Sequence, residues 1–176
     1  RGISIPFFHA ANTPATLFFP ESHLDLVRVG LGIYGMYPDA RRPLHLKPAL
    51  SLKTRVAFVK RVPQGSAVSY DSTYVTWKET SLAVLPIGYA DGLSRGLSNK
   101  GKVLIKGHFC PIVGHVTMDH TLIDVGDLPV SIGDEVILLG TDGTSEIHAH
   151  TWAQLLGTIN YEVTCMLSSR IERVYL

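Results

Sequence analysis

The sequence predicts a mainly β protein, in which an antiparallel barrel or sandwich with Greek-key-like connections follows a shorter stretch of mixed strands and helices. From Ala49 onward, short β-branched segments recur at fairly regular spacing and are separated by glycine, proline, asparagine and aspartate turns. Before that point the pattern is that of buried parallel strands joined by a helix. A proline-rich linker at residues 37–48 separates the two patterns. We therefore expect one domain over residues 1–42 and a second over residues 43–176.

The first part of the chain has the order strand, helix, strand. Residues 2–10 and 27–35 are apolar enough for buried parallel strands, and the second run ends in a glycine-rich turn. Between them, Asn12 or Thr13 can cap a short helix that has Pro14 in its first turn. This pattern predicts two consecutive βα units.

The later segments are typical of strands in an antiparallel fold. Turn residues separate β-branched runs at residues 51–62, 81–90, 101–107, 110–118, 120–127 and 134–140. Apolar residues at helical spacing predict one short helix that ends at Gly157, followed by a last strand at residues 170–176. We expect this half to be mainly β.

Charge and composition narrow the classes of partner. Lys and Arg total 16 against 15 Asp and Glu, without long runs, so we expect no nucleic acid and no membrane surface. Every apolar run falls short of the roughly 18 residues of a spanning helix, and we expect a cytoplasmic protein. Cys110 and Cys165 lack metal-ligand spacing and the histidines form no metal constellation, so no metal is expected.

Two stretches contain candidate functional groups with simpler alternatives. Residues 67–74, AVSYDSTY, place two tyrosines between apolar runs, and such aromatic residues commonly anchor a hairpin loop. Residues 29–35, VGLGIYG, lack the full dinucleotide fingerprint, and their N–H groups suit either a plain tight turn or an anion nest. Arg28, just before that stretch, could form a salt bridge with Asp25 at the end of its strand.

Several segments, taken together and in order, resemble the C-terminal portion of alanine racemase: FHAANTPATL, VRVGLGIYGMYP, AVSYDSTY, LPIGYADGLSRGL, PIVGHVTMDHTLIDVG and INYEV. The resemblance covers nearly the whole chain. It implies that residues 1–42 end a (β/α)₈ barrel that binds pyridoxal phosphate and that residues 43–176 form the C-terminal β-domain. It further implies an isomerase that interconverts L-alanine and D-alanine for peptidoglycan of the cell wall, as a homodimer with shared active sites.

The resemblance also implies roles for single residues. Tyr70 would be one of two bases on opposite faces of the cofactor. The other base is a lysine in a segment that does not occur in this sequence, so we expect this chain alone to be inactive. Met118 and Tyr89 would contact the substrate. The residues matched to cofactor binding are Arg28, Thr13, Gly30, Leu31 and Tyr161.

The entrance to the site leaves two alternatives open. Arg95 matches an entrance arginine of the family, whereas His115 stands where many members have arginine, and histidine can lose its charge near neutrality. A related racemase that uses the same cofactor could act on serine or on broader substrates. A non-catalytic β-barrel module for interaction or dimerisation is the second alternative, although a plain scaffold would have no need of the residues named above.

Overall fold

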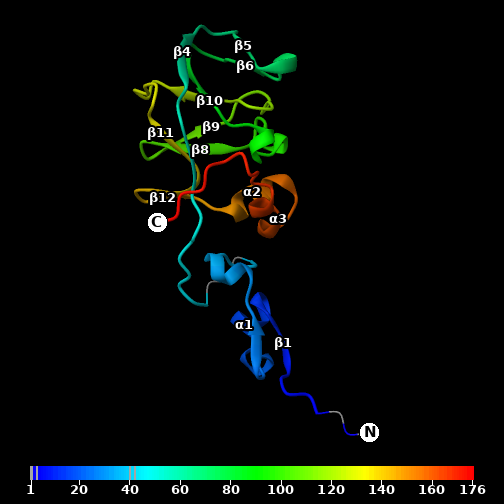
Figure 1. Ribbon diagram of the computed structural model, residues 1–176. Helices are drawn as coiled ribbons and strands as arrows, with labels where there is room; N and C mark the ends of the chain where they lie inside the picture. The colour runs from blue at the N-terminus through cyan, green and yellow to red at the C-terminus, as the bar shows by residue number, and fades with distance from the viewer. Residues whose placement is uncertain (1, 3, 40, 42) are drawn as a thin grey trace. The chain divides into compact units, whose positions relative to one another are not determined.

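The computed structural model describes residues 2, 4–39, 41 and 43–176, and the chain divides into two compact units, residues 1–50 and residues 51–176 (Figure 1). Unit 1, the first of these, contains one parallel strand pair with a helical connection. Its elements are β1 (His9–Asn12), α1 (Thr13–Phe18), η1 (Pro20–Ser22), β2 (Leu26–Arg28) and η2 (Leu31–Tyr34). The predicted order of strand, helix and strand is confirmed.

Local sequence signals explain where α1 begins. Asn12 is the N-cap residue, and its side chain accepts a hydrogen bond from the N–H of Ala15 at 3.1 Å. Pro14 lies in the first turn, where its missing N–H costs nothing. Of the strand predicted over residues 2–10, the described residues form a strand only from His9 onward, and Ile3 lies outside the described residues; Pro6 has no N–H to donate to a ladder.

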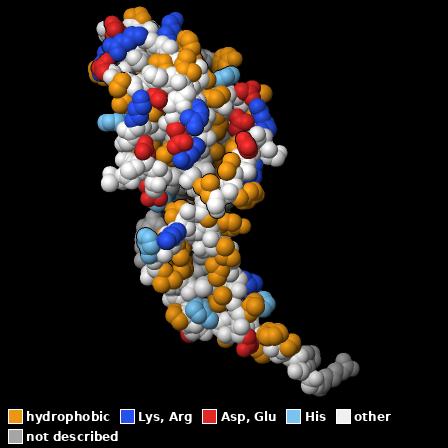
Figure 2. Space-filling model, turned by 60° about the vertical axis from the view of Figure 1, so that its left-hand side comes forward, with side chains coloured by type: hydrophobic (Ala, Val, Ile, Leu, Met, Phe, Trp, Pro, Cys, Tyr) orange, Lys and Arg blue, Asp and Glu red, His pale blue; other side chains and the backbone are white. Residues whose placement is uncertain are grey.

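Unit 1 leaves its strand pair uncovered. All residues of β2 are exposed. Parallel strands are ordinarily buried on both faces, and exposed apolar patches of this kind mark surfaces that other structure covers. Figure 2 shows the apolar side chains as orange patches at the surface of unit 1. Among the described residues of this unit, the exposed large apolar ones are Ile5, Phe7, Phe8, Phe19, Leu24, Leu26, Val27, Ile33, Tyr34, Leu44 and Leu50.

Unit 2, residues 51–176, is built from antiparallel strands, which confirms the prediction of a mainly β chain. One sheet has the order β10-β7-β4, and a second has the order β12-β11-β8-β9 with β3 also paired to β11. A two-stranded ribbon of β5 and β6 is drawn at the top of Figure 1. The strands are β3 (Leu52–Arg55), β4 (Phe58–Val62), β5 (Ala67–Val68), β6 (Tyr74–Val75), β7 (Thr80–Leu85), β8 (Lys102–Ile105), β9 (His108–Pro111), β10 (Thr121–Gly126), β11 (Glu135–Asp142) and β12 (Ser145–Ile147).

Short helices occupy the connections of unit 2. Three single-turn helices are η3 (Tyr70–Ser72), η4 (Tyr89–Asp91) and η5 (Arg95–Leu97). The predicted helix is α2 (Ala149–Leu156), and Gly157 ends it with φ of 70°, as expected. Helix α3 (Asn160–Cys165) follows directly and was not predicted, because six residues are too few to establish a helical period.

Four predicted strands of unit 2 differ from the structure. The strand expected over residues 81–90 ends at Leu85, and η4 follows it. Residues 51–62 form two strands, β3 and β4, which join different sheets. The strand expected over residues 110–118 ends at Pro111, and Gly114 turns the chain with φ of 73°. The last strand, expected over residues 170–176, was wrong: this segment is largely exposed and pairs with no described strand. β-propensity alone does not make a strand without a free neighbouring edge.

The core of unit 2 fixes the loops described below. Buried and half-buried residues alternate along β10, so Thr121, Ile123 and Val125 face inward. Leu104 and Leu138, on paired strands β8 and β11, are completely buried. Among the described helices, none has the length and apolar character needed to cross a membrane.

Candidate active site

In unit 1, hydrogen-bond donors converge on the turn that follows β2. Thr13 is buried at the start of α1, and its Oγ1 accepts the N–H of Gly30 at 3.0 Å and that of Gly32 at 3.4 Å. Among the described residues, neither the hydroxyl proton of Thr13 nor the N–H of Leu31 has an acceptor. Buried donors are normally satisfied, so the turn holds two neutral donors ready for a bound acceptor.

The same turn leaves space for such an acceptor. A Cβ atom at Gly32 would lie 3.0 Å from Val29 Cγ1 and 3.1 Å from Thr13 Cγ2, whereas one at Gly30 would meet nothing within 4 Å. The backbone of Gly30 is therefore open on that side. Neutral N–H and O–H donors on one such turn suit a phosphate dianion.

Arg28, at the end of β2, is bonded to a residue that the sequence analysis missed. Its Nη1 donates to Nδ1 of His9 at 2.6 Å. Because guanidinium only donates, Nδ1 is the acceptor in this hydrogen bond, which leaves Nε2 as the donor nitrogen of the ring. The salt bridge to Asp25 is not seen among the described residues, since that carboxylate instead accepts the N–H of Phe8 at 2.9 Å. The only sequence feature that could have indicated this contact was the predicted pairing of two parallel strands, one with His9 and the other with Arg28.

In unit 2, Tyr70 is presented on a tightly held loop. Its side chain is 72% exposed. Ser69, Asp71 and Ser72 all have positive φ, at 64°, 60° and 49°, a conformation that costs free energy and concentrates at functional sites. Ser69 Oγ donates to the carbonyl of His115 at 2.9 Å, and Asp71 Oδ2 lies 3.3 Å from Nε2 of His115. These contacts hold the strained loop against residues 114 and 115.

Tyr74 has a different environment, although it lies only four residues away. It is partly buried, and its hydroxyl donates to Asp124 Oδ2 at 3.1 Å. Burial, reinforced by the charge of Asp124, raises the pKa of Tyr74, so this phenol stays protonated as a donor. Tyr74 therefore anchors the ribbon, as the simpler interpretation predicts, and only Tyr70 is presented to solvent.

Tyr89 and Met118 lie on two loops that are joined through their backbones. The N–H of Tyr89 donates to the carbonyl of Thr117 at 2.9 Å, and the N–H of Ala90 donates to that of Met118 at 3.0 Å. A Cβ atom at Gly88 would lie 2.2 Å from Thr117 O, so only glycine permits this approach. The side chains of Tyr89 and Met118 are 44% and 53% exposed. The N–H of Met118 donates to no described residue.

The other two predicted site residues also belong to unit 2. Arg95 begins η5 and is exposed; the end of this helix is tied to the same region, because Ser98 Oγ accepts the N–H of Val116 at 2.9 Å. Tyr161 lies on α3 and is 37% exposed. The structure thus gathers the loops of Tyr70, Tyr89 and Met118 around residues 113–119, a segment on which η5 also rests.

Sequence reasoning also missed a charged cluster beside these loops. Arg170 Nη2 lies 2.7 Å from Asp119 Oδ1, and its Nε lies 3.3 Å from Asp91 Oδ1. Asp91 and Asp119 are the aspartates of the YADG and MD motifs that contain Tyr89 and Met118, so the sequence offered a signal for both of them. Arg170, which contacts both aspartates, lies far from them in the sequence, and no local sequence feature indicated these contacts.

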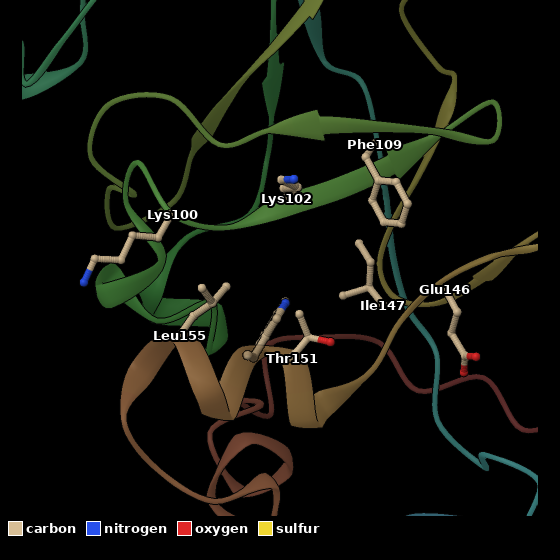
Figure 3. Close-up of a pocket in the computed structure, with 8 residues that line it drawn as sticks. Lys100, Lys102, Phe109, Glu146, Ile147, Thr151 and Leu155 are labelled. Carbon is tan, nitrogen blue, oxygen red and sulfur yellow. The ribbon is translucent and has the colours of Figure 1, made fainter. Parts of the chain in front are cut away.

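A separate hollow of about 380 Å³ lies elsewhere in unit 2 (Figure 3). Phe109, Ile147 and Leu155 face it, while the charged ends of Lys100 and Glu146 extend away from it (Figure 3). Its lining offers no convergent polar groups comparable to those above. The described residues also include no cluster of three metal-ligating side chains.

Comparison with known proteins agrees with this division. Residues 1–38 match a family model described as the N-terminal domain of alanine racemase, and residues 49–175 match that of its C-terminal domain. Parts of two domains of one class of isomerase, the amino-acid racemases, are therefore joined in this chain. The chain belongs to the alanine racemase family.

Individual relatives support the same family assignment. An alanine racemase of Clostridium perfringens is 51% identical over 99% of this chain and 46% of its own length. The crystal structure of alanine racemase from Streptomyces lavendulae matches with a TM-score of 0.95 at 44% identity, over 99% of this chain and 47% of that one. Alanine racemase from Bartonella henselae, solved with covalently bound pyridoxal phosphate, matches with a TM-score of 0.91 at 32% identity, over 99% and 48%. The chain spans a little under half the length of the curated relatives it matches.

Proposed function

We propose that this chain is the C-terminal region of a pyridoxal-phosphate-dependent alanine racemase that interconverts L-alanine and D-alanine. Residues 1–42 would be the last βα units of the (β/α)₈ barrel, and residues 43–176 the C-terminal β-domain. The uncovered β1–β2 pair supports the first part, because further βα units would bury its apolar faces. The proposed setting is a cytoplasmic homodimer that supplies D-alanine for the cell wall.

The cofactor fits the donors of unit 1. Pyridoxal phosphate, when bound, supplies an electron sink for the substrate's α-carbon. The hydroxyl of Thr13 and the amide of Leu31 would hold its phosphate, together with the phenol of Tyr161. The amide of Gly30, which donates to Thr13 Oγ1 in this structure, would join them by exchanging that acceptor for the phosphate. Arg28 would donate to the pyridine nitrogen, and His9 would keep its guanidinium in one orientation.

The exposure of Tyr70 on a strained loop is the observation that best supports this proposal. A phenol that is exposed yet held by a strained loop can meet a substrate that comes from another part of the assembly. As one of two bases, Tyr70 would give or take the α-proton at its hydroxyl oxygen, and the lysine outside this chain would act on the other face. The free N–H of Met118 would bind the substrate carboxylate. Tyr89 and Arg95 would line the entrance.

The test is the activity of the complete protein that contains this chain. We expect it to form D-alanine from L-alanine, measured by chiral chromatography, and to turn over serine much more slowly. The chain of 176 residues alone should not racemise alanine, because the segment with the cofactor lysine of the family does not occur in this sequence. Faster turnover of serine would favour the broader racemase, and no racemisation by the complete protein would favour a non-catalytic module.

A further inference from the structure

We propose that Arg170 is a positioning residue that fixes the loops of Tyr89 and Met118 relative to each other; this inference rests on the proposed function. Arg170 lies in the segment that follows α3, far in sequence from both loops. Its guanidinium joins Asp119, the neighbour of Met118, to Asp91, which ends the helix that Tyr89 begins. One side chain thus reaches both loops.

The acceptors of Arg170 differ in exposure. The side chain of Asp91 is only 13% exposed, and its Oδ2 also accepts the N–H of Gly88 at 2.9 Å. The side chain of Asp119 is 46% exposed, so the ion pair with Asp119 is more open to solvent than the one with Asp91. Without Arg170, the carboxylates of Asp91 and Asp119, which both lie within 3.3 Å of its guanidinium, would lose the cation between them, and like charges repel. The cation therefore turns a repulsive pair into a link between the loops.

Backbone contacts bring the Arg170 segment to this point. The N–H of Ser168 donates to the carbonyl of Asp91 at 3.0 Å. A Cβ atom at Gly92 would lie 2.3 Å from Met166 O, so the chain after α3 lies directly against the end of η4. Arg170 is thus carried by a segment that is itself packed on the Tyr89 loop. Its reach to Asp119 then sets where the Met118 loop lies.

The consequence concerns the substrate rather than the proton transfer. Met118 N–H and Tyr89 belong to different loops, and their backbones meet through hydrogen bonds of 2.9 and 3.0 Å. If the link through Arg170 is lost, the N–H of Met118 and the side chain of Tyr89 are both still present, but their positions relative to each other become less fixed. Substrate binding should therefore weaken more than the chemical step.

The test uses Arg170→Gln in the complete racemase, with Arg61→Gln as a matched control. Arg61 also bridges two carboxylates, Glu79 and Asp127, but on β4 and with exposed partners. For Arg170→Gln we expect KM for alanine to rise about tenfold, as for one lost charge-assisted hydrogen bond, with kcat falling less than about threefold. Amide hydrogen exchange at Tyr89 and Ala90 should accelerate about tenfold. Arg61→Gln should change neither quantity.

Two further variants separate the outcomes. Arg170→Lys keeps the charge but not the two-sided reach, so it should lie between wild type and Arg170→Gln. If Arg170→Gln does not fold, Asp119→Asn repeats the test by removing only the Met118 side. Unchanged KM and unchanged amide exchange in the folded variant overturn the proposal. If the complete wild-type protein racemises no alanine, the proposed function has failed instead of this inference alone.

Discussion

Replacing Gly88 by alanine tests how closely the Tyr89 and Met118 loops approach. The backbone of Gly88 has φ of −147° and ψ of −162°, which alanine adopts without strain, so any cost comes from the added methyl group. That methyl carbon would lie 2.2 Å from Thr117 O and 2.4 Å from Met118 O. Such contacts do not occur below 3.0 Å, so the loops must separate.

The cost of that separation follows from the contacts that it breaks. The hydrogen bonds of 2.9 and 3.0 Å from Tyr89 and Ala90 would lengthen beyond bonding range. Two backbone hydrogen bonds contribute about 1 kcal/mol each, and a methyl group forced into a packed site adds about 1–3 kcal/mol. We expect the free energy of unfolding to fall by about 3–5 kcal/mol.

Urea unfolding of the chain, followed by tryptophan fluorescence, measures this change, because Trp152 is buried in unit 2. Gly107→Ala is the control. Gly107 has φ of 76° and open space around it, so alanine there costs only the left-handed conformation, about 1–2 kcal/mol. A Gly88→Ala variant as stable as the Gly107→Ala variant or more so would show that the loops do not approach as described.

Two further predictions concern titratable groups. Burial, with a smaller contribution from Asp124, raises the pKa of the Cys110 thiol to about 11. At about pH 8, iodoacetamide should therefore modify the exposed Cys165 in the folded chain and should modify Cys110 only after unfolding. Mass spectrometry measures which cysteine is modified. The Lys106 ammonium, followed by the N–H of Ser131, holds the pKa of Asp134 below its usual value. The stability this gives is present above the unfolded pKa of about 3.9 and is lost as pH falls through the lowered folded value. Asp134→Asn should therefore lower Tm near pH 7 and make little difference near pH 2; equal losses at both pH values would contradict this.

Elements with local signals were predictable from the sequence. Asn12 and Pro14 mark the start of α1, and the apolar spacing with Gly157 marks the end of α2, because capping and periodicity act within a few residues. The strand expected at residues 170–176 failed for the opposite reason. Whether a β-branched run becomes a strand depends on an available edge, which is a property of the whole sheet.

The same distinction applies to the site. Segments such as AVSYDSTY and IGYADG could be singled out from the sequence, yet it could not tell which tyrosine is presented and which is bonded to Asp124. That choice depends on a residue fifty positions away in the chain. The links of Arg28 to His9 and of Arg170 to both aspartates are likewise set by tertiary structure.

The most direct test of the central claim compares Tyr70→Phe with Tyr74→Phe in the complete protein that contains this chain. The measurement is the exchange of the α-proton of each alanine enantiomer with deuterated solvent by NMR, beside the racemisation rate. Removing a positioned base typically costs 10²- to 10⁴-fold, so Tyr70→Phe should racemise that much more slowly while one enantiomer still exchanges its α-proton. Tyr74→Phe should keep near-normal rates. Near-normal racemisation by Tyr70→Phe, or equal loss of exchange for both enantiomers, would contradict the assignment of Tyr70 as one of two bases.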